Sequence, residues 1–182
     1  DSDSHKTLPT VSFDKARIDS VELYPYRRLI KEGLSSVMVA HLNVPSLEAR
    51  DGYPSSLSKH IVTDILKVKL GFKGLIFTDA LTMKGAADFS ETGAIDLAAF
   101  NAGNDVMLMS VDVGIGVSKI MDAYNKGEIS ESRLEHSVKK ILQAKYKVGL
   151  NNYEPIGLYN LSKDLNRLKD DILYEELLEN AI

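Results

Sequence analysis

The chain has 182 residues, of which 44% are hydrophobic and 26% charged, and its formal net charge is -4. This balance is typical of a folded globular domain and excludes a disordered chain. Lys and Arg are scattered among acidic residues, which argues against a nucleic-acid partner. No apolar run approaches the ~20 residues that cross a bilayer. The absence of Cys excludes a disulfide framework and a thiolate metal site, but it does not distinguish a cytoplasmic protein from an exported one.

Three short apolar runs punctuate the first two thirds of the chain. They are rich in β-branched or aromatic residues and show no alternation with polar residues, which is typical of parallel strands buried on both faces. Roughly 30 residues separate one run from the next, about the length of a strand-helix repeat. The pattern therefore predicts an α/β fold with strands at residues 36–41, 74–79 and 104–109.

Segments with helical periodicity surround these runs. The first is expected to be capped by Asp19 or Ser20, and Gly residues stand just beyond several of the predicted ends, where a helix commonly stops. Pro25 falls near the start of the first helix, where its missing N–H is tolerated. The predicted helices cover residues 19–32, 58–69, 92–102, 113–125 and 130–148.

The composition changes after residue 148. Residues 149–159 are rich in turn formers and predict a linker, and the charged stretch 161–182 is expected to be helical and to pack on something through its apolar residues. We therefore predict that residues 1–148 belong to one domain. Residues 149–182 would form a linker and either the start of a following domain or a packing helix.

Three parallel strands are too few for a stable sheet whose faces are covered by helices. We expect the fold to be incomplete within this sequence. If the parent fold is a (β/α)8 (TIM) barrel of ~250 residues, this chain would be its C-terminal portion and the other strands would precede Asp1.

Polar residues end each predicted strand, at the edge where parallel α/β folds gather their sites. They are His41, Thr78 with Asp79, and Ser110 with Asp112. A carboxylate that ends a buried strand suits a nucleophile at the barrel mouth. By position alone, Asp79 is equally well explained as a turn or cap residue.

Two longer motifs favour the catalytic interpretation. Residues 74–86, GLIFTDALTMKGA, resemble the nucleophile motif of glycoside hydrolase family 3, and residues 1–9, DSDSHKTLP, resemble the Asp-Ser/Thr-His loop of its β-N-acetylglucosaminidase branch. The resemblance implies that Asp79 is the nucleophile, His5 the general acid/base and Asp3 the partner that orients it. The 74 residues from His5 to Asp79 are similar to the spacing in that family.

The resemblance also implies an activity. The expected function is a retaining, exo-acting glycoside hydrolase that releases terminal N-acetyl-β-D-glucosamine through a covalent glycosyl-aspartate intermediate. Retention needs one group that attacks carbon and another that protonates the leaving oxygen and then activates water. An imidazole with a pKa near ~6.5 can do the latter, and a neighbouring carboxylate stabilises its charged form. An imidazole also avoids a second fixed anion opposite Asp79.

Two further residues are candidates for substrate binding. Residues 37–42 resemble the sixth strand of the family barrel, which implies that His41 faces the pocket, although a structural hydrogen-bonding role is an alternative. Met83 follows the nucleophile motif and is expected to shape the pocket floor or simply to fill space. The four His show no metal-ligand spacing, so neither a metal nor a cofactor is expected.

Several alternatives remain at this point. A phosphoacceptor receiver domain also has a strand-ending Asp, but it needs an acidic pair after an earlier strand to hold Mg²⁺, and here that strand ends in Ala40 and His41. A non-catalytic half-barrel and transfer to phosphate instead of water are also open. The family's sugar-holding Lys-His stretch would lie in the missing N-terminal part of the barrel, which is thus an expected partner, and this chain alone is expected to be inactive. The natural substrate is not determined by the sequence.

Overall fold

The computed structural model describes residue 3 and residues 6–181. It divides into two compact units, Asp1–Lys147 and Val148–Ile182. Each is described by itself below. That residues 149–182 begin a following domain stays a prediction.

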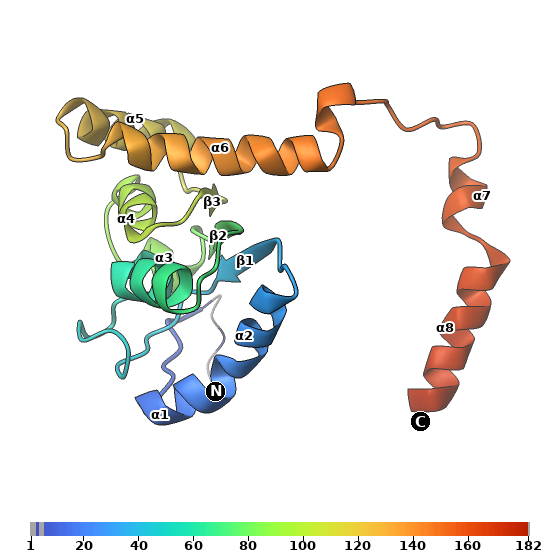
Figure 1. Cartoon of the computed structure of the whole chain (residues 1–182), viewed down its shortest axis with the longest axis horizontal. Coiled ribbons are helices and arrows are strands. Elements are labelled where there is room, and N and C mark those ends of the chain that lie inside the picture. Colours follow the sequence, from blue (N-terminus) through green and yellow to red (C-terminus); the bar gives the residue numbers. More distant parts are fainter. Residues whose placement is uncertain (1–2, 4–5, 182) are drawn as a thin grey trace. The chain divides into compact units, whose positions relative to one another are not determined.

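The first unit is built around a three-stranded parallel sheet in the order β1-β2-β3 (Figure 1). The strands β1 and β2 pair in register, with Val37 opposite Ile76 and Met38 opposite Phe77. The pairing of β2 with β3 is interrupted by a register shift between Phe77 and Ala80. All three predicted strands are present, and the α/β class is confirmed. Their bounds are Ser36–Val39 for β1, Leu75–Ala80 for β2 and Val106–Leu108 for β3.

Helices cover one face of this sheet. Val37 and Ile76 point to that face and form a buried cluster with residues of the helical layer, namely Val62, Leu66, Phe72 and Ala102. Successive side chains of a strand point to opposite faces of the sheet. On the opposite face, the side chain of Met38 is 56% exposed and that of Leu108 is 40% exposed. Within the described residues, the prediction that the strands are buried on both faces is therefore wrong. The unbroken apolar pattern thus gives the sheet a second apolar face, which the described residues cover only in part.

The helical segment before β1 starts earlier than predicted. The cap of this segment is Asp14, not Asp19 or Ser20. The carboxylate of Asp14 accepts a hydrogen bond at 2.7 Å from the backbone N–H of Arg17. Asp19 instead accepts from Lys69 at 2.6 Å. Pro25 is in the first turn of α2. The bounds are Lys15–Arg17 for α1, Ile18–Glu22 for η1 and Tyr24–Lys31 for α2.

Two short helical segments connect β1 to β2, namely η2 (Ser55–Leu57) and η3 (His60–Lys69). The hydroxyl of Ser58 accepts a hydrogen bond from the N–H of Ile61 at 3.3 Å and so caps the start of η3, where the sequence predicts it.

The helices on both sides of β3 were predicted except for α3, which has only four residues. Gly93, with φ of 77°, precedes α4, which begins two residues later than predicted. Asp112 caps α5, accepting from the N–H of Ile115 at 2.9 Å. Buried Phe100 of α4 packs with Ala123 and Ile129. The bounds are Lys84–Ala87 for α3, Ala94–Ala102 for α4, Val113–Asn125 for α5 and Glu131–Lys147 for α6.

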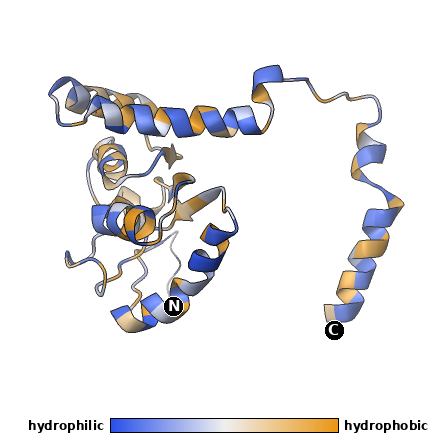
Figure 2. Cartoon of the chain, viewed as in Figure 1, coloured by the Kyte–Doolittle hydropathy of each residue, from blue (hydrophilic) through white to orange (hydrophobic). Residues whose placement is uncertain are grey.

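The second unit consists of η4 (Leu150–Asn152), α7 (Leu161–Leu165) and α8 (Leu168–Ala181). Apolar and polar residues mix along α8 (Figure 2), and its Leu173 and Leu177 are exposed. Over the described residues, no helix combines the length and hydropathy needed to cross a membrane.

Candidate active site

Asp79 lies at the carboxyl end of β2, one residue before the strand ends. Its side chain is half-buried. One carboxylate oxygen, Oδ1, accepts a hydrogen bond at 2.8 Å from the backbone N–H of Ala80. This bond fixes the carboxylate at the strand end, where the family motif expects a nucleophile.

His41 follows β1 and is completely buried. Its Nδ1 is 2.6 Å from the hydroxyl of Ser56, and its Nε2 is 3.0 Å from the carbonyl oxygen of Ala80. A carbonyl only accepts hydrogen bonds, so Nε2 carries the proton of the neutral ring and Nδ1 accepts from Ser56. Burial lowers the pKa of His41, against the opposing effects of the Ala80 carbonyl and the negative charge of Asp79.

This environment bears on the two roles that the sequence left open for His41. A ring with both nitrogens bonded and no exposed surface does not line an open pocket in this structure. Contact with a substrate stays a prediction, whereas the hydrogen-bonding role is what the geometry displays. His41 thus bonds to the carbonyl of Ala80, the residue whose N–H bonds to the carboxylate of Asp79.

The nucleophile motif and the segment that follows the Asp-Ser-His motif meet at Gly85. A Cβ placed on Gly85 would lie 3.3 Å from the carbonyl oxygen of Thr7, 3.5 Å from Cδ1 of Leu8 and 3.4 Å from Cβ of His41. Only a residue without a side chain fits there without displacement. The two motif regions therefore approach each other closely, although about 75 positions separate them along the chain.

Backbone hydrogen bonds hold the N-terminal segment in this place. The N–H of Asn43 donates to the carbonyl of Pro9, and the N–H of Val11 donates to the carbonyl of Asn43, both at 2.8 Å. The carbonyl of Asp3 accepts from the N–H groups of Lys6 and Thr7. The segment is thus attached to the chain that follows β1.

A surface hollow of about 380 Å³ lies between the two motif regions. Met83, almost fully buried, directly precedes the α3 residues that line one side, but is not itself part of the lining. His5 lies outside the described residues, so its imidazole is not placed relative to Asp79. The hollow is lined by Lys6, Thr7, Leu8, Gly52, Lys84, Gly85, Asp88 and Phe89.

The other strand-end candidates have structural roles. The buried Thr78 hydroxyl accepts a hydrogen bond at 3.0 Å from the N–H of Leu108 and so helps to join β2 to β3. Asp112 is the cap of α5. The Ser110 hydroxyl is buried without a hydrogen-bond partner. No cluster of three or more metal-ligating side chains is found among residues 3 and 6–181.

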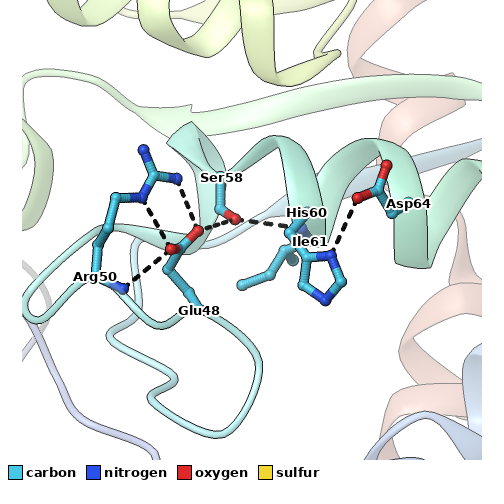
Figure 3. Close-up of polar contacts among 6 residues, drawn as sticks. All are labelled: Glu48, Arg50, Ser58, His60, Ile61 and Asp64. Carbon is cyan, nitrogen blue, oxygen red and sulfur yellow. Dashed lines mark hydrogen bonds and ion pairs between the residues drawn. The ribbon is translucent and has the colours of Figure 1, made fainter.

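Sequence reasoning missed a charged clamp beside the hollow, formed by Glu48, Arg50 and Ser58 (Figure 3). Arg50 donates to the carboxylate of Glu48 at 2.9 and 2.8 Å, and the hydroxyl of Ser58 donates to it at 2.5 Å. Hydrogen bonds from Arg50 lower the pKa of buried Glu48 to about 2. The signal in the sequence was an acid two residues before an Arg within a loop rich in turn formers.

The clamp also orders the aromatic residues near the hollow. The guanidinium of Arg50 lies 3.4 Å from the ring centroid of Tyr53. Tyr53 in turn makes an edge-to-face contact with Phe89, at 4.8 Å between centroids. Since Phe89 lines the hollow, the loop after β1 and the loop after β2 are coupled at its rim.

Parallel strands, helices on one face and a carboxylate at the strand ends define part of a (β/α)8-type domain. Residues 1–144 match the family model described as the glycosyl hydrolase family 3 N terminal domain, so the chain belongs to glycosyl hydrolase family 3. The phosphoacceptor receiver alternative finds no support in these matches.

Relatives with known names agree with this family. β-Hexosaminidase A of Pseudoalteromonas piscicida is 28% identical over an alignment of 165 positions, which covers 80% of this chain and 28% of that protein. A β-hexosaminidase of Chromobacterium violaceum is 39% identical over 107 residues, covering 59% of this chain and 29% of its own length. Among solved structures, a family 3 β-N-acetylglucosaminidase from Paenibacillus sp. str. FPU-7 superposes with a TM-score of 0.81 at 32% identity, covering 86% of this chain and 30% of that one. The chain thus spans less than a third of the length of these relatives.

Proposed function

We propose that the chain forms part of the catalytic barrel of a retaining, exo-acting glycoside hydrolase that releases terminal N-acetyl-β-D-glucosamine. The observation that carries the proposal is the contact of Gly85 with Thr7 and Leu8. It joins the region of the proposed nucleophile to the region of the proposed acid/base. The names of the relatives, β-hexosaminidase and β-N-acetylglucosaminidase, support the choice of sugar.

Asp79 is the nucleophile in this proposal. A carboxylate oxygen attacks the anomeric carbon while the bond from that carbon to the leaving oxygen breaks, which gives a glycosyl ester. Water then attacks the same carbon and releases the carboxylate. The N–H of Ala80 holds one carboxylate oxygen in place and leaves the other for attack.

His5 supplies and recovers the proton, and Asp3 orients it. The protonated imidazole donates to the leaving oxygen in the first step, and the neutral ring takes a proton from water in the second. The hydrogen bonds of Pro9 and Val11 to Asn43, which attach the following segment to the chain after β1, support this role.

The proposal includes a partner, namely the N-terminal part of the same barrel. The sheet face that carries Met38 and Leu108 is only partly covered by the described residues, and apolar side chains of adjacent strands would bury it. That part would also bring the residues that hold the sugar. We therefore propose that catalysis needs the longer protein.

The test uses that longer protein and an aryl N-acetyl-β-D-glucosaminide. The first product should keep the β configuration in an NMR time course, and a 5-fluoro glycosyl fluoride analogue should leave a sugar mass on the peptide that contains Asp79. Asp79→Ala should remove turnover and labelling together, whereas Asp88→Ala, at the rim of the hollow, should retain the label. An α-configured first product, or a label on another residue, would refute the assignment.

The acceptor is decided by a second measurement. Addition of inorganic phosphate should leave free N-acetylglucosamine as the product. Accumulation of the sugar 1-phosphate would instead show a phosphorylase built on the same residues.

A further inference from the structure

A basic groove lies at the opposite end of the strands from Asp79. Two adjoining hollows between η3 and α6 share Lys67 and His136. Asp105, which directly precedes β3, is buried beside them and anchors β2 through a 3.0 Å hydrogen bond from the N–H of Ile76. The charged and polar lining residues are Lys59, Thr63, Lys67, Lys73, Asn101, Glu128, Ser130, Arg133, His136, Lys139, Lys140 and Gln143.

The buried acidic group of this region, Asp105, is already engaged, whereas the acidic Glu128 lines the second hollow. The carboxylate of Asp105 accepts from Lys140, from the hydroxyl of Ser137 at 2.6 Å and from the backbone of Ile76. Lys139 forms an ion pair with Glu135 at 2.6 Å. One buried carboxylate therefore faces more than one cation.

Arg133 adds a cation whose hydrogen bonds go to neutral groups. It donates to the carbonyl oxygens of Phe100 at 2.9 Å and Asn104 at 2.6 Å, and to the hydroxyl of Ser137 at 2.5 Å. These bonds fix the guanidinium but leave its charge without a carboxylate of its own. Its position raises the positive potential of the groove.

Lys67, which lines both hollows, is a cation without an ion pair among the described residues. Its ammonium group is packed so closely to Gly103 that a Cβ there would lie 3.2 Å from Nζ. Its side chain is half-buried in the groove. Burial, followed by repulsion from Arg133 and Lys140, lowers the pKa of Lys67 to about 8, against the attraction of Asp105.

His136 experiences the same crowding from the other side of the groove. Burial and the positive charges of Lys140, Lys67 and Arg133 lower its pKa, although Asp105 opposes them. A bound anion would remove this repulsion and pair the ammonium group of Lys67.

We propose that the groove between η3 and α6 binds a small multivalent phosphate anion, with Lys67 as the central contact and His136 and Lys73 at its sides. Two adjoining hollows that share Lys67 and His136 suit two linked phosphoryl groups better than one. Charge-assisted hydrogen bonds from ammonium groups to phosphate oxygens supply the affinity. The site is independent of the proposed hydrolase chemistry.

Calorimetric titration of the 182-residue chain with inorganic pyrophosphate at low ionic strength tests the proposal. Saturable binding with one site is expected, and Lys67→Met should weaken it by about tenfold or more. Lys31→Met, at the exposed end of α2, removes the same charge elsewhere and should leave the affinity unchanged. His136→Gln, a substitution on the exposed side of α6, should weaken binding several-fold and covers the case in which Lys67→Met fails to fold.

Three results would overturn the site. They are the absence of saturable heat at millimolar pyrophosphate, an equal loss of affinity in Lys31→Met, and binding of polyglutamate as tight as that of pyrophosphate. The second would show general electrostatic attraction, and the third a surface for acidic chains instead of a phosphate site.

Discussion

The imidazole Nε2 of His41 donates a 3.0 Å hydrogen bond to the carbonyl oxygen of Ala80, whose own N–H holds the carboxylate of Asp79. The ring is buried, and Ser56 fixes its other nitrogen at 2.6 Å. The end of β1 and the end of β2 are thus joined by one side chain at the position of the proposed nucleophile.

Replacement of His41 tests the stability of this link. His41→Ala leaves the Ser56 hydroxyl and the Ala80 carbonyl without their partner and opens a cavity, so the free energy of unfolding should fall by about 2–4 kcal/mol. His60→Ala, which removes a solvent-exposed pair with Asp64, should cost less than about 1 kcal/mol. Urea unfolding measures both. Equal losses would show that the buried hydrogen bonds of His41 contribute nothing specific.

The same residue predicts a dependence of stability on pH. Because the pKa of folded His41 is below its value of 6.5 in the unfolded chain, the unfolded state binds the proton more tightly. The contribution of neutral, buried His41 to the free energy of unfolding is therefore fully present above pH 6.5. It is lost as the pH falls below 6.5, because the unfolded chain then takes up the proton. The drop in unfolding free energy from pH 7.5 to pH 5.5 should be smaller in His41→Gln than in the parent chain. The pKa of His136 is also lowered, so the same measurement on His136→Gln gives the part of the drop that comes from His136. A drop in His41→Gln as large as in the parent chain would contradict the prediction.

The clamp at Glu48 makes a separate prediction at lower pH. Its pKa is depressed to about 2, chiefly by Arg50, so its stabilisation is present above pH 4.5 and fades as the pH falls toward 2. Glu48→Gln should lower the free energy of unfolding by about 1–3 kcal/mol at pH 7, and by less at pH 3. Glu22→Gln, in the more exposed pair with Arg17, should change it by less than about 1 kcal/mol. A difference that is the same at both pH values would exclude the charge of Glu48 as the cause.

The sequence predicted the parts of the fold that depend on local pattern. The strands around Val37, Ile76 and Met107 are continuous apolar runs, and helix α5 begins at a capping Asp and was predicted with its observed bounds. The first helix was misplaced because Asp14, Asp19 and Ser20 are all acceptable caps, and only the hydrogen bond to Arg17 chooses among them. Helix α3 is too short to show a period.

In the candidate site, too, the sequence predicted the features that depend on local pattern and missed those that depend on distant contacts. Asp79 was found because its motif is local and its strand is recognisable. The contact of Gly85 with Thr7, the bonds of Asn43 to the N-terminal segment and the burial of His41 all arise between segments far apart in sequence. No periodicity encodes such contacts, which is why the sequence alone did not reveal the two hydrogen bonds of His41.

Gly85→Ala probes whether the contact between the motif regions matters for activity. An added methyl group would press on the carbonyl of Thr7, so the segment after the acid/base motif should shift by a few tenths of an ångström. Ala favours the helix α3 by up to about 1 kcal/mol, so stability should change little while kcat of the longer protein falls by about tenfold. Gly157→Ala, where nothing lies within 4 Å, should alter neither quantity. An unchanged kcat in Gly85→Ala would show that catalysis does not depend on this contact.

His5→Ala tests the proposed transfer of a proton from the imidazole to the leaving oxygen. General acid catalysis contributes about 10²–10⁴-fold, and it is needed most when the leaving oxygen is strongly basic. In the longer protein, kcat/KM should therefore fall by that factor for an N-acetylglucosaminide with an alkyl or sugar leaving group, and far less for a dinitrophenyl one. Asp3→Asn should show a weaker form of the same pattern, because it leaves the imidazole in place but no longer stabilises its charged form. If both substrates slow equally in His5→Ala, the imidazole is not the proton donor, and another group near the hollow, such as Asp88, must be tested in its place.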